Sequence, residues 1–379
     1  MADKFRRLRE CMDEAIEKSG LPGIDCIIYQ EHKEIFRHAS GYMDVANKLP
    51  PAPGALYNIY SSTKMITCTA AMQLVEDGRM LLTDPLHKYL PEYEHMQVKY
   101  GTWAFSPAKS PIRVVDLFKM TAGFSYDGDT PHLKKLKDDS KGCFTTREFA
   151  EAVAKEPLLF NPGEGWNYGF CHEVLGALIE VISGKSLGEF MRDNIFEPLG
   201  MKDSGFTVPE EKKSRLAPQY YYDAATSSVI PVDVKSYAAN EWDKYESGGG
   251  GLIMSPEDYI LFADALACGG VGANGARIIS KNSITLMSKN QLKGASLEAY
   301  RNSGTQEGYG FGLGSGVIYD QAEALSLRPE GVFAWGGIGG MQNMVDPVNK
   351  LSYYVSRHVV MAPKDSMGAN MLNILYSAL

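Results

Sequence analysis

Two residues one helical turn apart, Ser61 and Lys64, have the types and the spacing that a nucleophilic hydrolase needs. They stand near the start of LYNIYSSTKMITCTAAMQLVEDG, a segment with helical apolar periodicity that ends near Gly78. On a helix, residues i and i+3 share a face with Cβ atoms about 5 to 6 Å apart, so the two side-chain tips can meet. Burial or a cationic neighbour can leave a lysine amine neutral enough to take the serine proton. The pair therefore predicts a serine nucleophile that Lys64 activates.

A purely structural role is the alternative for both residues. Ser61 could cap the helix and Lys64 could be a solvated surface residue. Serine and lysine at this spacing recur by chance in many chains, so the pair alone does not decide. Ser62 and Thr63 are neighbouring hydroxyl residues, but only Ser61 has a lysine three positions later.

Two other segments match short motifs of other enzyme classes. The segment GKSLG, Gly184 to Gly188, matches the G-x-S-x-G nucleophile elbow, but an elbow follows a strand and a helical pattern precedes this one. We expect Ser186 to cap the next helix instead. The segment GVGANG, Gly270 to Gly275, has the spacing of a dinucleotide fingerprint and also follows a helical pattern, so we expect a turn.

The elements that would position Ser61 and Lys64 come from both ends of the chain. Residues 24–30 and 34–44 indicate a β-hairpin, and short β-rich segments from residue 309 onward precede a last helix over 366–377. Residues 83–240 are mainly helical in pattern. We predict an α+β fold, an antiparallel β-sheet flanked by helices: residues 1–82 and 241–379 form an α/β domain, residues 83–240 a mainly helical second domain, and the site lies in the cleft between them.

Composition and charge exclude several classes of protein. Hydrophobic residues make up 44% and charged residues 22% of the 379 residues, as in globular proteins. The net charge of -8 and the absence of a basic run argue against a nucleic-acid partner. The six cysteines form no C-x-x-C pair and the seven histidines no H-x-x-x-H pair, so we expect no metal site, no disulfide framework and no cofactor.

The start of the chain has the pattern of an amphipathic helix that ends at Gly20. Acidic residues interrupt it, whereas a secretory signal needs about 7 to 15 uninterrupted apolar residues. No segment approaches the roughly 18 apolar residues that span a membrane. We therefore expect a cytoplasmic protein without a membrane partner, and the oligomeric state stays open.

A set of motifs in order along the chain resembles one known family. FNPGEGWNYGFCHEVLGALIEVISGKSL resembles the second motif region of class C β-lactamases, D,D-peptidases and the related family VIII carboxylesterases, all of the serine β-lactamase-like and penicillin-binding-protein-like family. DPLHKYLPEY, VVDLFKMTAGFSY, ESGGGGLIMSPEDYILFADAL, YGFGLGSGV and FAWGGIGGMQNMVDP match in the same order. The resemblance implies a catalytic triad of Ser61, Lys64 and Tyr168, in which the phenol relays a proton between Ser61 and the leaving group.

The third motif region bears on the substrate. Where β-lactamases and peptidases of this family carry Lys-Thr-Gly or His-Thr-Gly, this chain has Trp335-Gly336-Gly337, as in the esterase branch. An indole cannot bind a carboxylate as a lysine does, but it can form an apolar wall. The resemblance further implies an oxyanion hole made by the backbone N–H groups of Ser61 and Ile338. Phe170 stands where those enzymes commonly carry an asparagine that binds the substrate amide.

These observations favour a carboxylesterase that cleaves small-molecule esters with short or medium acyl groups through an acyl-enzyme on Ser61. Trp335, Gly336, Gly337 and Phe170 would contact the substrate. A β-lactamase or D-amino-acid peptidase of the same fold, with a β-lactam or peptide substrate, is the alternative. An acyltransferase, or a catalytically silent ligand-binding relative, is a third reading.

Overall fold

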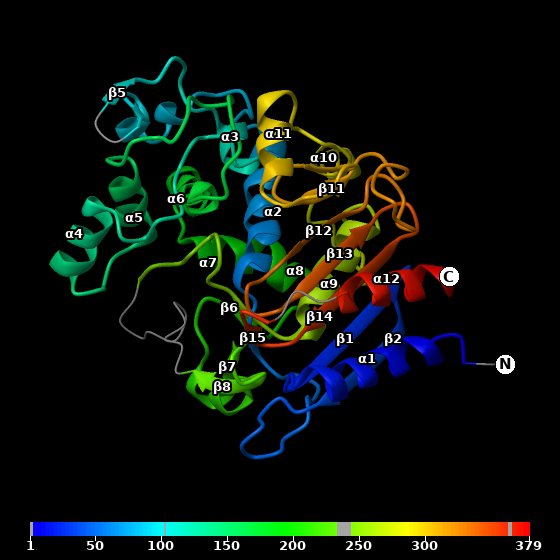
Figure 1. Ribbon diagram of the computed structural model, residues 1–379. Helices are drawn as coiled ribbons and strands as arrows, with labels where there is room; N and C mark the ends of the chain where they lie inside the picture. Colours follow the sequence, from blue (N-terminus) through cyan, green and yellow to red (C-terminus); the bar gives the residue numbers. More distant parts are fainter. Residues whose placement is uncertain (1–2, 102–103, 233–243, 363–365) are drawn as a thin grey trace.

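The centre of the molecule is a seven-stranded antiparallel sheet built from both ends of the chain (Figure 1). The computed structural model describes residues 3–101, 104–232, 244–362 and 366–379. The sheet has the order β10-β11-β12-β13-β14-β1-β2, so an N-terminal hairpin pairs with a C-terminal strand. Its strands are β1 (Gly23–Gln30), β2 (Lys33–Gly41), β10 (Tyr309–Phe311), β11 (Gly316–Ile318), β12 (Phe333–Gly336), β13 (Gln342–Asp346) and β14 (Leu351–Ser356).

One face of this sheet is covered by the first and last helices, α1 (Arg6–Ser19) and α12 (Met367–Ser377), which lie side by side in Figure 1. Side chains alternate between the faces of a strand, and Ile24, Cys26 and Ile28 of β1 pack in this layer. The predicted end of α1 is confirmed, because Gly20 ends the helix in the left-handed conformation with a φ of 69°.

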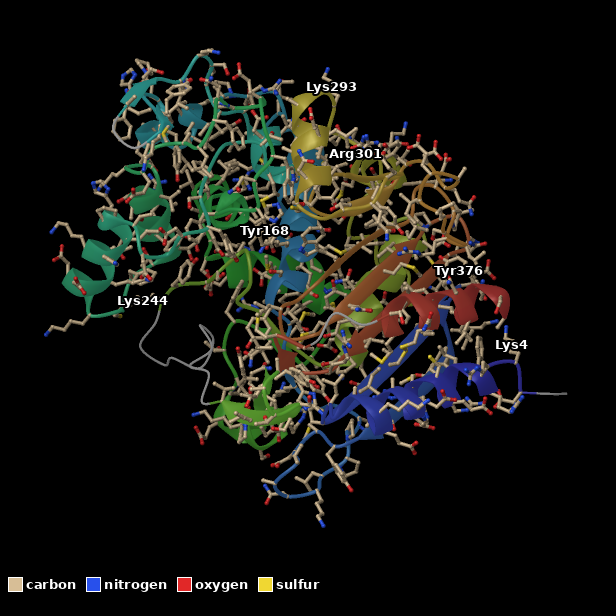
Figure 2. The ribbon with its side chains drawn as sticks, in the orientation of Figure 1. Lys4, Tyr168, Lys244, Lys293, Arg301 and Tyr376 are labelled. Carbon is tan, nitrogen blue, oxygen red and sulfur yellow. The ribbon has the colours of Figure 1, made fainter. Side chains whose placement is uncertain are left out.

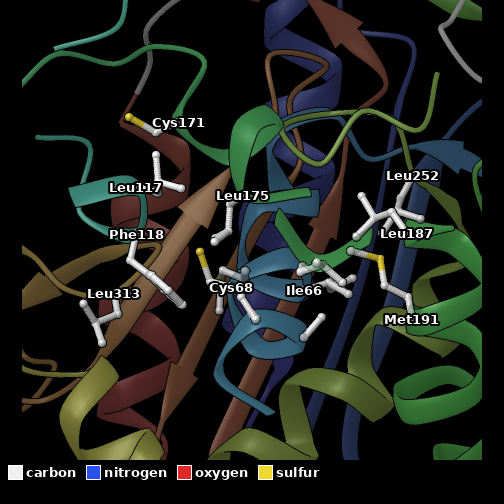
Figure 3. Packing of buried hydrophobic residues seen from close by; sticks show 14 of the residues in the cluster. Ile66, Cys68, Leu117, Phe118, Cys171, Leu175, Leu187, Met191, Leu252 and Leu313 are labelled. Carbon is white, nitrogen blue, oxygen red and sulfur yellow. The ribbon is translucent and has the colours of Figure 1, made fainter. Parts of the chain in front are cut away.

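The opposite face of the sheet packs against α9 (Pro256–Ala267) and the large core that contains α2 (Thr63–Glu76). Almost every residue of α2 is buried, which fits a helix that is apolar on all sides. Figure 3 shows Ile66 and Cys68 of this helix among side chains from several other segments. The labelled neighbours are Leu117, Phe118, Cys171, Leu175, Leu187, Met191, Leu252 and Leu313. This packing places the start of α2 in the interior of the molecule.

Helices dominate the middle of the chain. They are α3 (Val114–Phe118), α4 (Pro131–Ser140), α5 (Thr146–Val153), α6 (Cys171–Ser183), α7 (Leu187–Met191) and α8 (Glu197–Leu199), with a π-helical turn (Arg192–Phe196) between the last two. Two further helices, α10 (Lys281–Met287) and α11 (Ala295–Asn302), follow α9. None of the described helices has the length and apolar character that a membrane crossing requires.

The middle of the chain also contains strands that the helical pattern did not predict. β4 (Gln97–Tyr100) pairs with β5 (Ala104–Pro107), and β7 (Gln219–Asp223) lies between β8 (Ser228–Val232) and β15 (Val359–Val360). A third small sheet joins β3 (Tyr57–Asn58), β9 (Ile253–Met254) and β6 (Ser204–Gly205). The predicted domain boundary between residues 240 and 241 lies outside the described residues, and the division into two domains stays a prediction.

Candidate active site

Ser61 lies in a tight 3₁₀ turn, Tyr60–Ser62, that leads directly into α2. Tyr60 has a φ of 46°, in the left-handed region, which costs a non-glycine residue about 1 to 3 kcal/mol and needs support from its surroundings. Gly337 supplies a close contact, because a Cβ atom at that position would lie 2.5 Å from the carbonyl oxygen of Ile59. The turn therefore presents Ser61 beside the end of β12.

Lys64 is fully buried in the first turn of α2. Its Nζ donates hydrogen bonds to Ser61 Oγ at 3.2 Å and to the carbonyl oxygen of Gly249 at 2.5 Å. The expected meeting of the two side chains across one helical turn is thus present. The structure excludes the alternative of a solvated surface lysine.

Tyr168 comes from the loop before α6 and meets the same serine. Its hydroxyl group donates to Ser61 Oγ at 2.7 Å, and Figure 2 shows Tyr168 beside α2. Gly169 fixes this loop, because a Cβ atom there would lie 2.2 Å from the carbonyl oxygen of Phe124. Phe170 follows and contacts the ring of Tyr126, with ring centroids 5.0 Å apart. The structure therefore brings Ser61, Lys64 and Tyr168 together.

Trp335 is the last aromatic residue of β12 and stacks on Tyr168. Their ring centroids are 5.7 Å apart at an interplanar angle of 26°, and the indole Nε1 lies 3.5 Å from the phenol oxygen. Gly336 ends β12, while Gly337 packs against the turn of Ser61 as described. Ile338 follows with an exposed side chain. The residues expected to contact substrate thus come from β12 with the segment after it and from the loop of Tyr168, and both of these segments contact the turn or the side chain of Ser61.

Asn343 is a buried residue of β13 that the sequence did not single out. Its side-chain oxygen accepts the backbone N–H of Trp335 at 3.1 Å, and its side-chain nitrogen donates to Ser62 Oγ at 3.1 Å. One amide therefore links the strand that carries Trp335 to the turn that carries Ser61. Only the pairing of β12 with β13 reveals it, so no local sequence signal could have found this role.

The charge of Lys64 is set by opposing effects. Burial lowers the pKa of Lys64, but the neighbouring Tyr168 and Tyr126 phenols and the Glu173 carboxylate raise it, and the net result is a pKa above that of an ordinary lysine. The Nζ atom lies 4.7 Å from the ring centroid of Tyr168 and 5.5 Å from that of Tyr126, a cation–π arrangement. Lys64 is therefore an ammonium group in the resting site.

Three potential metal ligands meet far from Ser61, at the tip of the N-terminal hairpin. Atoms of His32, Asp264 and Cys268 lie within 4.8 Å of one another. Both oxygens of Asp264 already accept hydrogen bonds from His32, and burial together with Asp264 raises the pKa of Cys268 to about 12. We assign no metal to this cluster, whose hydrogen bonds satisfy its members.

A family model described as Beta-lactamase matches residues 8–363. The chain belongs to the β-lactamase family. This confirms the predicted resemblance to serine β-lactamase-like and penicillin-binding-protein-like proteins. With the sheet and helices described above, it also confirms the α+β fold class.

Several similar proteins carry the names of enzymes. Esterase EstB of Burkholderia gladioli is 26% identical over 369 residues, which cover 91% of this chain and 88% of the esterase. The ML-236A carboxylate methylbutanoyltransferase mlcH of Penicillium citrinum is 27% identical over 326 residues, covering 80% and 76% of the two chains. The solved structure of EstCE1, described as a hydrolase with promiscuous acyltransferase activity, has a TM-score of 0.83 at 22% identity over 98% of each chain. The named relatives support a serine hydrolase or acyltransferase as the broad class of this β-lactamase family member.

Proposed function

We propose that the protein is a carboxylesterase that forms an acyl-enzyme on Ser61. The observation that carries this proposal is the pair of contacts on Ser61 Oγ, from Tyr168 at 2.7 Å and from Lys64 at 3.2 Å. A serine hydroxyl group is a weak nucleophile until a neighbouring group takes its proton, and these contacts have the reach that proton transfer needs.

Acylation proceeds by attack of Ser61 Oγ on the ester carbonyl carbon. The serine proton passes to the Lys64–Tyr168 pair and then to the oxygen of the departing alcohol as its bond to carbon breaks. Water repeats the sequence in reverse, attacking the acyl-enzyme and releasing the acid. No cofactor takes part in these steps.

Backbone N–H groups of Ser61 and Ile338 form the oxyanion hole in this proposal. The close approach of Gly337 to Ile59 supports it, because it holds the segment before Ile338 against the turn of the nucleophile. One such donor is worth about 2.7 to 4 kcal/mol of transition-state stabilisation in other hydrolases. A residue larger than glycine at position 337 would push the segment before Ile338 away from the turn of Ser61.

The lining of the site favours a neutral substrate. Trp335 and Phe170 stand where related β-lactamases carry residues that bind the charged or amide groups of their substrates. Trp335 stacks on Tyr168, and Tyr126 adds a third ring that contacts both Tyr168 and Phe170. Aromatic walls bind apolar acyl groups and offer no counter-ion for a carboxylate. We therefore propose esters with short or medium uncharged acyl groups as substrates, with β-lactams as poor ones.

Acyl transfer is the second candidate activity. The similarity to a named methylbutanoyltransferase and to EstCE1 favours it, since the same acyl-enzyme can be taken by an alcohol in place of water. Adding an alcohol acceptor to the ester assay separates the two activities by the ratio of transesterified to hydrolysed product.

A substrate profile tests the proposal. Rates with aryl esters of increasing acyl length and with the β-lactam nitrocefin are compared for the protein and for Ser61→Ala. We expect ester turnover to exceed nitrocefin turnover and to disappear in the variant. Faster nitrocefin than ester hydrolysis would instead make the protein a β-lactamase.

A further inference from the structure

Glu173 is a buried carboxylate near Lys64 that the proposed mechanism does not use. It lies in the first turn of α6 and is 4% exposed. Its Oε1 accepts a hydrogen bond from Ser247 at 2.8 Å, and its Oε2 has no hydrogen-bond partner in the part of the chain that the structure describes. A buried carboxylate with so little support is costly unless a cation lies close by.

Lys64 is that cation. A methyl group on Gly249 would lie 2.3 Å from Glu173 Oε1 and 3.3 Å from Lys64 Nζ, so both charged groups face the same point of the backbone. Glycine leaves the space between them free of a side chain. Glycine is therefore needed at position 249, within the glycine run 248–251, because a side chain there would clash with Glu173. The carboxylate and the ammonium group face each other in the protein interior, where the dielectric constant is low and their attraction is strong.

The thiols and the imidazole around Lys64 do not supply a negative charge near neutral pH. Burial raises the pKa of Cys68 well above its ordinary value and that of Cys171 to about 12, so both are thiols. Burial, helped by Lys64, lowers the pKa of His172 to about 3, so this residue is neutral. The remaining neighbours are the phenols of Tyr126 and Tyr168. Glu173 is therefore the carboxylate that balances the lysine.

We propose that Glu173 is the counter-ion of Lys64, a positioning residue that keeps the shared proton of the Lys64–Tyr168 pair on the lysine nitrogen. The inference rests on the proposed function of Ser61 and on Tyr168 as the group that takes its proton, and it adds the role of Glu173. The Tyr168 oxygen, as phenolate, accepts the Ser61 proton while the bond from Oγ to the carbonyl carbon forms. It then gives that proton to the leaving alkoxide as the ester C–O bond breaks, and Lys64 stays an ammonium group throughout.

Two readouts test this assignment. The first is the tyrosinate ultraviolet absorbance of the protein minus that of Tyr168→Phe, followed against pH without substrate. The second is the pH profile of kcat/KM for an aryl ester. We expect the Tyr168 tyrosinate signal to rise with the same midpoint as the rising limb of kcat/KM. If Lys64 were the base, no tyrosinate signal would appear at the midpoint of the rising limb, and that result would overturn the proposal.

Glu173→Gln is the decisive variant. Removal of a negative charge beside a cationic pair makes the pair lose its proton more easily, so the rising limb should move to lower pH by about one unit. Without the Glu173 charge, the shared proton should favour the lysine nitrogen less strongly, so the plateau of the tyrosinate signal should also be lower. A structural role alone would change kcat or stability without moving the midpoint. A limb that stays in place, or moves to higher pH, contradicts the proposal.

Matched variants complete the experiment. Glu173→Asp keeps the charge, and Glu180→Gln removes a carboxylate from the same helix, so both should keep the limb close to its original position. If Glu173→Gln does not fold, Gly249→Ala displaces the Glu173 carboxylate instead and should shift the limb in the same direction. The substrate-free titration separates this proposal from the proposed function. Ester turnover that survives in Ser61→Ala would end the latter and leave the titration interpretable.

Discussion

Two serines of this chain stand in nucleophile-like motifs, and their surroundings are opposite. Ser61 lies between an ammonium group and a phenol, with its hydroxyl oxygen bonded to both. Ser186 caps α7 as predicted, where its oxygen accepts the backbone N–H of Glu189 at 3.2 Å and its hydroxyl group donates to Glu246 at 3.3 Å. The G-x-S-x-G motif therefore marks the start of a helix in this protein.

The difference lies in the charge around each hydroxyl group. The start of α7 is already occupied by carboxylates, because Glu180 accepts the N–H of Leu187 and Glu246 accepts that of Gly188. These acids use the positive end of the helix dipole and would repel a developing oxyanion. Ser61 instead faces a fixed positive charge. The charges around a serine hydroxyl group therefore distinguish a nucleophile from a helix-capping residue better than the sequence motif does.

Removal of Ser61 should have the largest effect on turnover. Loss of the nucleophile costs about 10⁶ in kcat in another serine hydrolase, and we expect a loss of that order for Ser61→Ala. Steady-state ester hydrolysis measures it. The control is Ser186→Ala, and a comparable loss of turnover in that variant would reverse the comparison between the two serines.

Lys64→Ala and Tyr168→Phe should follow in size. General acid–base groups contribute about 10² to 10⁴ in rate, and kcat should fall by that factor in each variant. Lys64→Ala also leaves Glu173 without its cation and should lower the free energy of unfolding, whereas Tyr168→Phe keeps that pair. Urea unfolding measured beside kcat separates the two effects. A folded Lys64→Ala variant with an unchanged rate would exclude the lysine from the mechanism.

Asn343→Ala should have an intermediate effect. The substitution leaves the buried N–H of Trp335 without an acceptor, at a cost of about 1 to 3 kcal/mol in the free energy of unfolding. It also frees the strand of Trp335 from the turn of Ser61, and a small misplacement of catalytic groups can reduce kcat by up to about 100-fold. Asn370→Ala, at an exposed position of α12, is the control. Equal kcat in both variants would remove the positioning role.

Ser186→Ala should affect stability alone. Loss of a serine cap costs about 1 kcal/mol, so the free energy of unfolding should fall by that amount while kcat stays at its original value. Chemical denaturation and the ester assay provide the two numbers. Stability equal to that of the unchanged protein would mean that the capping hydrogen bond contributes nothing.

The smallest expected effect is a pH dependence at the same helix start. Burial raises the pKa of Glu180 to about 7, so the folded protein binds this proton more tightly than the unfolded chain does. The free energy of unfolding should therefore fall as pH rises from about 4.5 to about 7, and Glu180→Gln should reduce this slope. Urea unfolding across that pH range measures it. An unchanged slope in the variant would place the dependence on other groups.

The catalytic trio was within reach of the sequence because each member stands in an ordered motif. Ser61 and Lys64 share one helical turn, and Tyr168 follows a recognisable Pro-Gly loop. Glu173 has a local signal in the sequence, because it is an acidic residue in the first turn of a helix whose following residues are mostly apolar. Asn343 carried none, because its partners are distant in sequence and meet only through strand pairing.

The fold shows the same division. The hairpin, the C-terminal strands and the last helix follow local periodicity, and the fold class follows from them. β7 forms a local hairpin with β8, and its parallel pairing with β15 joins segments more than a hundred residues apart, which local periodicity cannot show. β4 and β5 are mostly exposed and lack the apolar alternation that marks a strand.

Covalent labelling tests the central claim most directly. The protein is treated with an aryl phosphonate, digested, and the modified peptide is identified by mass spectrometry. We predict a single adduct on Ser61 in the peptide that contains Lys64, and its loss in Lys64→Ala at neutral pH. An adduct on Ser186, or labelling that persists unchanged in Ser61→Ala, would contradict the assignment of Ser61 as the nucleophile.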